Sequence, residues 1–138
     1  MQPITIAITI NAPVQKVWDM WTLPAHITKW AFASDTWEAP YAENNVTVNG
    51  RFKTTMSAKD GSASFDFTGT YTQIDPHKVI AYTMDGDDAR NVHIIFVADG
   101  EVTHITETFD PENENPEDMQ RTGWQSILDN FKNYVETH

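Results

Sequence analysis

The sequence has no cysteine, few basic residues and no long apolar run, and each of these absences excludes a class of protein. Without cysteine there is no disulfide framework, thiolate nucleophile or thiolate metal site. Nine Lys and Arg residues against twenty Asp and Glu residues give a net charge of −11, which repels nucleic acid and anionic lipid headgroups. No segment approaches the roughly 18 apolar residues of a transmembrane helix, and the first residues show no signal peptide. We therefore expect a cytoplasmic protein that binds no nucleic acid and does not insert into a membrane.

Aromatic residues, in contrast, are abundant, with 5 Trp, 4 Tyr and 7 Phe. A chain of 138 residues can bury about two thirds of its unfolded surface, so residues 1–138 are expected to form one domain with its own core. The aromatic residues have two interpretations. They enrich that core, or some of them line a cavity, because ligand pockets favour aromatic walls.

The first thirty residues predict one strand followed by two short helices. Isoleucines alternate with Thr and Ala over residues 4–10, which is the pattern of a half-buried strand. Pro13 suits the first position of a helix. Apolar residues then follow at spacings of three and four, at Val14, Val17, Trp18 and Trp21. Residues 24–30 predict a second short helix packed back on the first.

Six further strands are expected in the middle of the chain, at residues 35–41, 50–57, 64–74, 79–84, 91–98 and 102–109. Turn signals such as Gly61 and Pro76 separate them. Gly69 lies inside a predicted strand, so it indicates a bulge or a close approach of a neighbouring segment. Strands joined by short turns pair as antiparallel neighbours.

The last segment, residues 115–138, predicts one long helix. Asn115 is the expected cap and Pro116 the first helical residue. One stripe of the helix is apolar, through Met119, Gly123, Trp124, Ile127, Leu128, Phe131, Tyr134 and Val135. A helix of roughly 22 residues spans roughly 33 Å, enough to lie across a small sheet. Gly123 costs about 1 kcal/mol in a helix interior relative to alanine. It is either a glycine tolerated at the surface or, as the family resemblance given below implies, a position that leaves space for close packing or for a cavity.

The element order predicts the α+β class, with an antiparallel sheet whose apolar face is covered by the C-terminal helix. Short motifs also keep a characteristic order: Ala12-Pro13 with Val17-Trp18, Pro24 to Trp30, Gly50 with Phe52, Gly69 with Tyr71, Ile74-Asp75-Pro76, Tyr82-Thr83, Val92 to Phe96, Thr103 to Thr106, and Gly123-Trp124 with Leu128. Together they resemble the activator of heat-shock protein 90 ATPase homologue family. That family belongs to the START-like, or SRPBCC, superfamily with the Bet v 1-like helix-grip fold.

This resemblance implies a curved antiparallel sheet that grips the C-terminal helix, with two short helices at one end. Between helix and sheet the superfamily typically leaves a deep apolar cavity that binds lipids, polyketides, hormones or other hydrophobic molecules. The candidate ligand-binding residues are Trp30, Phe32, Trp37, Phe52, Met56, Phe67, Tyr71, Tyr82, Phe96, Trp124, Leu128 and Phe131. For each of them the alternative is plain core packing. Thr54, Tyr71 and Tyr82 are candidates to orient a ligand by hydrogen bonds.

No catalytic or metal centre is predicted, and no cofactor is expected. His104 and Glu107 are three residues apart on one strand and should face opposite sides, which argues against a His/Glu metal or acid–base pair. Asp85, Asp87 and Asp88 resemble a calcium loop only in composition, because the order of ligands is missing. Nucleotide, phosphate and protease motifs are also missing.

The expected function is therefore the binding of a small hydrophobic or aromatic ligand between the sheet and the C-terminal helix. One alternative is a protein partner docked on the acidic surface, as for a co-chaperone. A cyclase-like or hydrolase-like enzyme that uses scattered polar groups of the cavity is the third and least supported reading.

Overall fold

The computed structural model describes residues 2–86 and 89–138. Along the chain the elements are β1 (Ile4–Ile10), α1 (Val14–Thr22), α2 (Pro24–Ile27), β2 (Trp37–Asn44), β3 (Arg51–Ala58), β4 (Ser64–Asp75), β5 (Val79–Met84), β6 (Asn91–Asp99), β7 (Val102–Phe109) and α3 (Glu117–Thr137). This is the predicted order, and the α+β class is confirmed. The expected ranges were residues 35–41 for β2 and 24–30 for α2, and each of these elements ends three residues away from its expected end.

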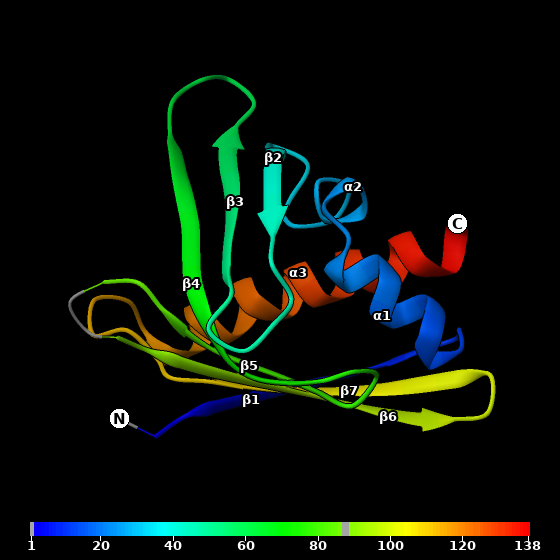
Figure 1. Ribbon diagram of the computed structural model, residues 1–138. Helices are drawn as coiled ribbons and strands as arrows, with labels where there is room; N and C mark the ends of the chain where they lie inside the picture. Colours follow the sequence, from blue (N-terminus) through cyan, green and yellow to red (C-terminus); the bar gives the residue numbers. More distant parts are fainter. Residues whose placement is uncertain (1, 87–88) are drawn as a thin grey trace.

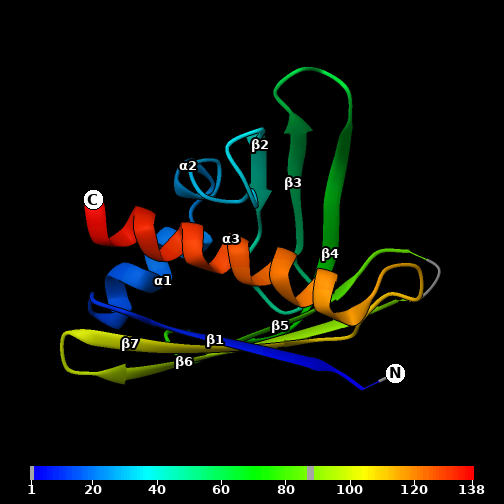
Figure 2. The ribbon, with the colours of Figure 1, turned by 180° about the vertical axis from the view of Figure 1, so that it is seen from behind.

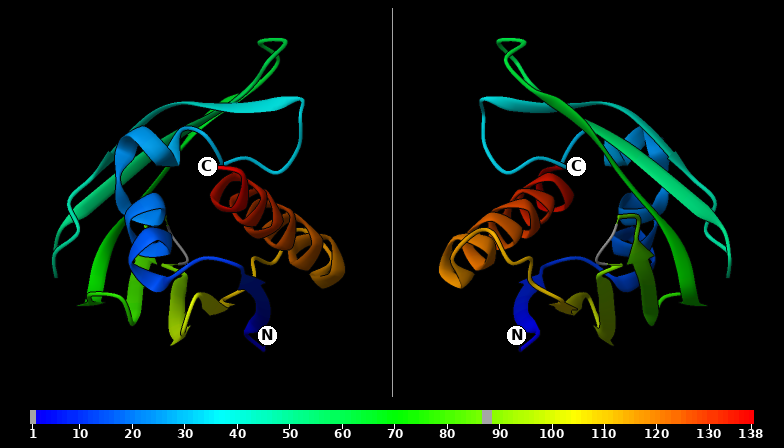
Figure 3. Two further views of the ribbon diagram at one scale, coloured as in Figure 1. Left: turned by 90° about the vertical axis from the view of Figure 1, so that its right-hand side faces the viewer. Right: turned by 90° about the vertical axis from the view of Figure 1, so that its left-hand side faces the viewer.

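The strands form one antiparallel sheet of 7 strands in the order β1-β7-β6-β5-β4-β3-β2. Strands β2 to β7 are consecutive neighbours, and β1 pairs with β7 at the far edge. In Figures 1 and 2, β2, β3 and the first half of β4 rise steeply from the layer that holds β1 and β5 to β7. The sheet is therefore curved, and α3 lies in its concave side (Figure 3). The predicted grip of the sheet on the C-terminal helix is confirmed.

Side-chain alternation sets the face that each strand turns toward α3. On β7 the buried residues are Thr103, Ile105, Glu107 and Phe109, and on β6 they are Val92, Ile94 and Phe96. Because side chains point alternately to the two faces of a sheet, these residues share the concave side. Glu107 is the acidic residue of an otherwise largely apolar row.

Gly69 permits a close approach inside the curved part of the sheet. A Cβ atom at this position would lie 2.7 Å from the Phe52 ring and 2.7 Å from the Thr83 carbonyl oxygen. Of the two predicted alternatives, the close approach therefore holds at Gly69. The register shift between β4 and β5 falls later, between Tyr71 and Gln73.

Polar side chains of α3 cover the open edge of β1. They donate hydrogen bonds to alternate carbonyls of the strand, from Arg121 to Thr5 (2.8 Å), from Gln125 to Ala7 (3.4 Å) and from Lys132 to Thr9 (2.5 Å). An uncovered strand edge exposes a row of unpaired backbone groups. These bonds satisfy that edge and fix the helix along the length of β1.

The start of α3 differs from the prediction. Pro116 is the residue before the helix, and the expected cap, Asn115, makes no capping hydrogen bond. The Asn115 side chain bonds to Glu112 instead. The Gln120 side chain accepts a hydrogen bond from the Glu112 backbone and donates one to the Asn115 carbonyl, both at 2.8 Å. The predicted cap is wrong because the chain before α3 folds back onto Gln120.

Helices α1 and α2 lie beside the C-terminal half of α3 (Figure 1). Val17, Trp18 and Ile27 are their main buried apolar residues, together with Met20. Helix α2 was expected over residues 24–30 but ends at Ile27, and the turn that follows brings Trp30 Nε1 within 2.9 Å of the Met20 carbonyl oxygen. Within the described residues, no helix has both the length and the apolar character needed to cross a bilayer.

Candidate functional site

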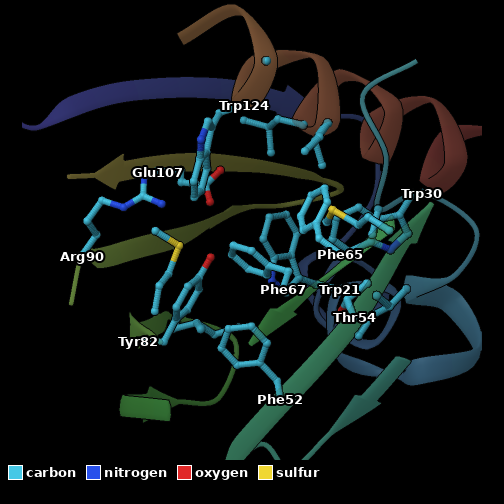
Figure 4. A pocket seen from close by; sticks show the side chains of 18 of the residues that line it. Trp21, Trp30, Phe52, Thr54, Phe65, Phe67, Tyr82, Arg90, Glu107 and Trp124 are labelled. Carbon is cyan, nitrogen blue, oxygen red and sulfur yellow. The ribbon is translucent and has the colours of Figure 1, made fainter. Parts of the chain in front are cut away.

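A cavity of about 410 Å³ lies between the N-terminal half of α3 and the concave face of the sheet. Its walls come mainly from β3, β4, β5 and α3 (Figure 4). The cavity reaches the surface beside Phe65 and Met119, which line it and are 51% and 60% exposed. It is therefore a hollow with an entrance.

Eight of the twelve candidate ligand-binding residues line this cavity: Trp30, Phe52, Met56, Phe67, Tyr71, Tyr82, Trp124 and Leu128. They come from the turn after α2, from three neighbouring strands and from α3. The fold therefore brings together residues that are up to almost a hundred positions apart in the sequence. Their role in binding a ligand stays a prediction.

The other four candidates, Phe32, Trp37, Phe96 and Phe131, lie outside the lining. Phe96 and Phe131 are buried against Trp21, with ring centroids 5.7 and 4.8 Å from it. Phe32 is half-buried beside the core, and Trp37 begins the edge strand β2. These four residues pack behind the cavity wall or near the end of the molecule, and their side chains do not line the cavity.

The aromatic walls meet edge-on. The Phe67 ring lies 6.1 Å from Tyr82 at 87° and 6.3 Å from Trp124 at 76°. Trp124 is held in place by stacking on Phe109, with centroids 4.1 Å apart and planes only 10° apart. Such crossed rings turn their faces in different directions, so the cavity offers ring faces on several sides.

Some polar groups of the cavity already form hydrogen bonds within the protein, and others do not. The Tyr71 hydroxyl donates to Asn44 Oδ1. Within the described residues, neither the Thr54 hydroxyl (residue 6% exposed) nor the Tyr82 hydroxyl (residue 8% exposed) has a protein hydrogen-bond partner. Burial raises the pKa of Tyr82 well above its ordinary value, so this side chain stays a neutral O–H donor. Thr54 and Tyr82 are thus the two predicted orienting groups that remain available.

Glu107 is the functional candidate that the sequence reasoning missed. It is 5% exposed and lines the cavity, and Figure 4 shows its carboxyl group between Trp124 and Tyr82. In the part of the chain that the structure describes, no hydrogen bond or ion pair joins this carboxyl group to another side chain. Burial raises its pKa from 4.5 to about 8. Strong pKa shifts of this kind gather at functional sites.

Strand parity was the signal that could have found Glu107. Because it alternates with Ile105 and Phe109, it belongs to the buried row of β7. His104 faces the other side, where it contacts Thr9 Oγ1 at 3.0 Å. The prediction that His104 and Glu107 face opposite sides is confirmed, and the same alternation places Glu107 on the buried face of β7.

Gly123 faces the hollow. A Cβ atom added there would have no neighbour within 4 Å, and the residue lines the cavity. The structure therefore favours the interpretation in which Gly123 leaves volume open for a cavity, instead of allowing a close contact.

The other acidic residues that the structure describes are not arranged as a metal centre. Among the described residues, no group of three or more His, Cys, Asp or Glu side chains is placed to hold a metal ion. Asp85 pairs with Arg51, which lowers the pKa of Asp85 to about 2. Asp87 and Asp88, the other members of the acidic loop, lie outside the described residues.

Comparisons with known proteins agree with this architecture. The family model of the Activator of Hsp90 ATPase homolog 1-like protein matches residues 11–136. The solution structure of an AHSA1-like protein from Aeromonas hydrophila is 40% identical, with a TM-score of 0.87 over 97% of this chain and 93% of that one. A solution structure from Cytophaga hutchinsonii is 48% identical, with a TM-score of 0.83 over 98% and 92%. The Aha1 dimer from Colwellia psychrerythraea, at 17% identity and a TM-score of 0.76 over 99% and 97%, shares the fold. No match was found among curated protein sequences.

Proposed function

Because the chain belongs to the family of Activator of Hsp90 ATPase homolog 1-like proteins, we propose that it is a START-like ligand-binding domain that holds a small apolar or aromatic molecule between α3 and the sheet. The observation that carries this proposal is the aromatic-walled cavity of about 410 Å³ with an entrance from solvent. A well-packed core has few voids larger than a water molecule, so a hollow of this size does not arise from ordinary packing.

The cavity volume limits the ligand. An engineered apolar cavity of roughly 150 Å³ binds benzene, so about 410 Å³ has room for two or three rings or a branched chain of similar bulk. Affinity would come from burying this apolar body, at about 25 cal/mol per Å² before the cost of association. Thr54 and Tyr82 would orient the ligand through their available hydroxyl groups.

The proposal is tested with N-phenyl-1-naphthylamine, an uncharged fluorescent probe with separate phenyl and naphthyl rings. We expect saturable fluorescence enhancement with one site per chain. Amide shifts in an NMR titration should fall on β3, β4, β5 and the first half of α3. Absence of saturable binding, or shifts confined to exposed loops, contradicts the proposal.

A pair of variants on α3 separates binding in the cavity from binding elsewhere. Gly123→Leu places a large side chain into the hollow, because the position faces open space, and should weaken probe binding at least tenfold. Thr122→Leu adds the same side chain at an exposed neighbouring position and should leave binding unchanged. Equal affinities for the two variants would show that the probe binds outside the cavity.

A second candidate function is docking on a protein partner, and the description of the matching family is the observation that favours it. A basic surface on the partner would then meet the net charge of −11, so association should weaken with salt. The test is the ATPase rate of a bacterial Hsp90 with and without this chain at low salt. Stimulation that Gly123→Leu leaves intact would favour docking over ligand binding.

A further inference from the structure

The cavity contains one buried acidic group whose presence apolar binding does not explain. Glu107 is 5% exposed and faces the hollow without a hydrogen-bond or ion-pair partner among the described side chains. Burying a carboxyl group without a partner is unfavourable. An isoleucine or leucine would fit the apolar row of β7 without this cost. The position of Glu107 therefore indicates that a ligand supplies the missing partner.

The charges around the cavity favour a positive ligand. Three carboxylic side chains line it, Glu43, Glu107 and Glu112, against one basic side chain, Arg90, within the described part of the chain. The whole chain carries a net charge of −11. A negative field of this kind raises the local concentration of cations and speeds their association.

The walls beside Glu107 also suit a cation. Phe67 lies edge-on to both Tyr82 and Trp124, so three aromatic rings border the same space (Figure 4). The faces of aromatic rings attract ammonium groups, most strongly where water is excluded. A carboxyl group beside ring faces can therefore bind both the charge and the apolar body of one molecule.

We propose that the natural occupant of the cavity is an amphipathic organic cation, an aromatic or branched aliphatic amine, whose ammonium group pairs with Glu107 while its apolar body packs against Phe67, Tyr82 and Trp124. This inference rests on the proposed function, since it names the class of ligand that the same cavity takes.

Pairing with an ammonium group requires the ionised carboxylate, which links binding to pH. Burial raises the pKa of Glu107 to about 8, so the carboxyl group is mostly protonated near pH 7. Binding of the cation releases this proton to solvent. The affinity should therefore rise with pH, approaching tenfold per unit below about pH 8, and level off above it. A neutral ligand that accepts a hydrogen bond from the protonated acid would show the opposite trend.

The other groups that face Glu107 do not produce this trend. Tyr82 on β5 stays neutral because burial raises its pKa. Arg90, just before β6, brings a basic side chain to the same lining. Glu112, before α3, is half-buried and bonds to Asn115. The residues paired with Glu107 on the neighbouring strands are Ile6 on β1 and Ile94 on β6. Helix α3 contributes Trp124 to the same lining. No histidine is among the described lining residues.

The experiment compares three molecules with the same ring system and different charge: naphthylethylammonium, naphthylethanol and naphthylacetate. Calorimetric titrations are made from about pH 6 to pH 8.5, where an alkylammonium such as that of lysine stays charged. We expect the ammonium compound to bind at least tenfold tighter than the alcohol at the upper pH, and the acetate to bind most weakly. Titrations near pH 7 in buffers of different ionisation enthalpy should show release of most of one proton per cation bound.

Two variants test the residue assignments. Glu107→Gln keeps the size of the side chain and should remove both the preference for the ammonium compound and its pH dependence, while the affinity for naphthylethanol changes less than threefold. Arg90→Gln removes the positive charge that faces the cavity and should strengthen ammonium binding. Weaker ammonium binding in Arg90→Gln counts against the inference.

The results separate this inference from the proposed function. If naphthylethanol binds as tightly as the ammonium compound, the cation inference is overturned and the binding cavity stands. The same holds if methyl naphthyl ketone, added as a neutral hydrogen-bond acceptor, binds more tightly than the ammonium compound and its affinity falls as pH rises. If none of these compounds binds, and N-phenyl-1-naphthylamine fails as well, both are overturned.

Discussion

The two halves of α3 cover the same sheet and meet similar aromatic side chains, yet one half is solidly packed and the other borders a hollow. In the C-terminal half, Phe131 is fully buried, with its ring 4.8 Å from Trp21 and 4.7 Å from Trp30. In the N-terminal half, Gly123 adds no side chain and Trp124 leans against Phe109. The two regions share their apolar character and differ in how much of the space between helix and sheet their side chains fill.

Hydrophobicity therefore places α3 on the sheet but does not decide whether the space between them is filled. The sheet curves away from the helix where β3 and β4 rise (Figure 2), so large side chains would be needed there to close the gap. Gly123 and the exposed Met119 do not close it. A binding site thus arises where side-chain volume falls short of the space that the curved sheet encloses.

The largest expected effect comes from deleting a ring in the packed half. Phe131→Ala should lower the free energy of unfolding by about 4 kcal/mol, because it removes a fully buried ring that packs against Trp21 and Trp30. Phe67→Ala removes the same ring from a half-buried residue that already borders the hollow and should cost only about 1 kcal/mol. Urea unfolding measures both. Equal losses would mean that the two regions are packed alike.

The sequence was sufficient for the element order, the antiparallel sheet and the covering helix, because strand alternation and helical spacing report directly on which face is buried. It did not distinguish Phe131 from Trp124, since both belong to the same apolar stripe and only one of them lines the cavity. Residues that line the cavity and residues of the packed core recur at the same helical spacing. The volume between them depends on sheet curvature, which no short motif encodes.

The next largest effect concerns Glu107, a buried residue on the side of the hollow. Its folded pKa of about 8 exceeds the ordinary 4.5, so the folded state holds a proton that the unfolded state loses as pH rises above about 4.5. Stability therefore falls by about 1.4 kcal/mol per pH unit between these values and levels off above pH 8. Glu107→Gln lacks this loss. The free energy of unfolding of the variant minus that of the wild-type protein should therefore be about 3 kcal/mol larger at pH 7 than at pH 4.

Urea unfolding of both proteins at a series of pH values provides the measurement for Glu107. The difference between them isolates one carboxyl group from the background of the other acidic residues. A difference that stays constant between pH 4 and pH 8 would show that the Glu107 carboxyl group is well solvated in the folded protein.

Substitutions at two glycines should have smaller effects on stability. Gly69→Ala places a methyl group 2.7 Å from both the Phe52 ring and the Thr83 carbonyl oxygen. The backbone oxygen cannot move away without disturbing the pairing of β4 with β5, so we expect a loss of about 2 kcal/mol in the free energy of unfolding. Unchanged stability would mean that the sheet adjusts freely at this point.

Gly123→Ala should have the smallest effect and the opposite sign. The added methyl group meets nothing within 4 Å, and alanine is favoured over glycine inside a helix by about 1 kcal/mol. The variant should therefore be more stable by up to that amount, while its methyl group takes only a small part of the cavity, so that binding of N-phenyl-1-naphthylamine weakens less than threefold. A loss of stability would show that α3 approaches the sheet closely at Gly123. The hollow would then be narrower than about 410 Å³, and the contrast between the two halves of the helix would disappear.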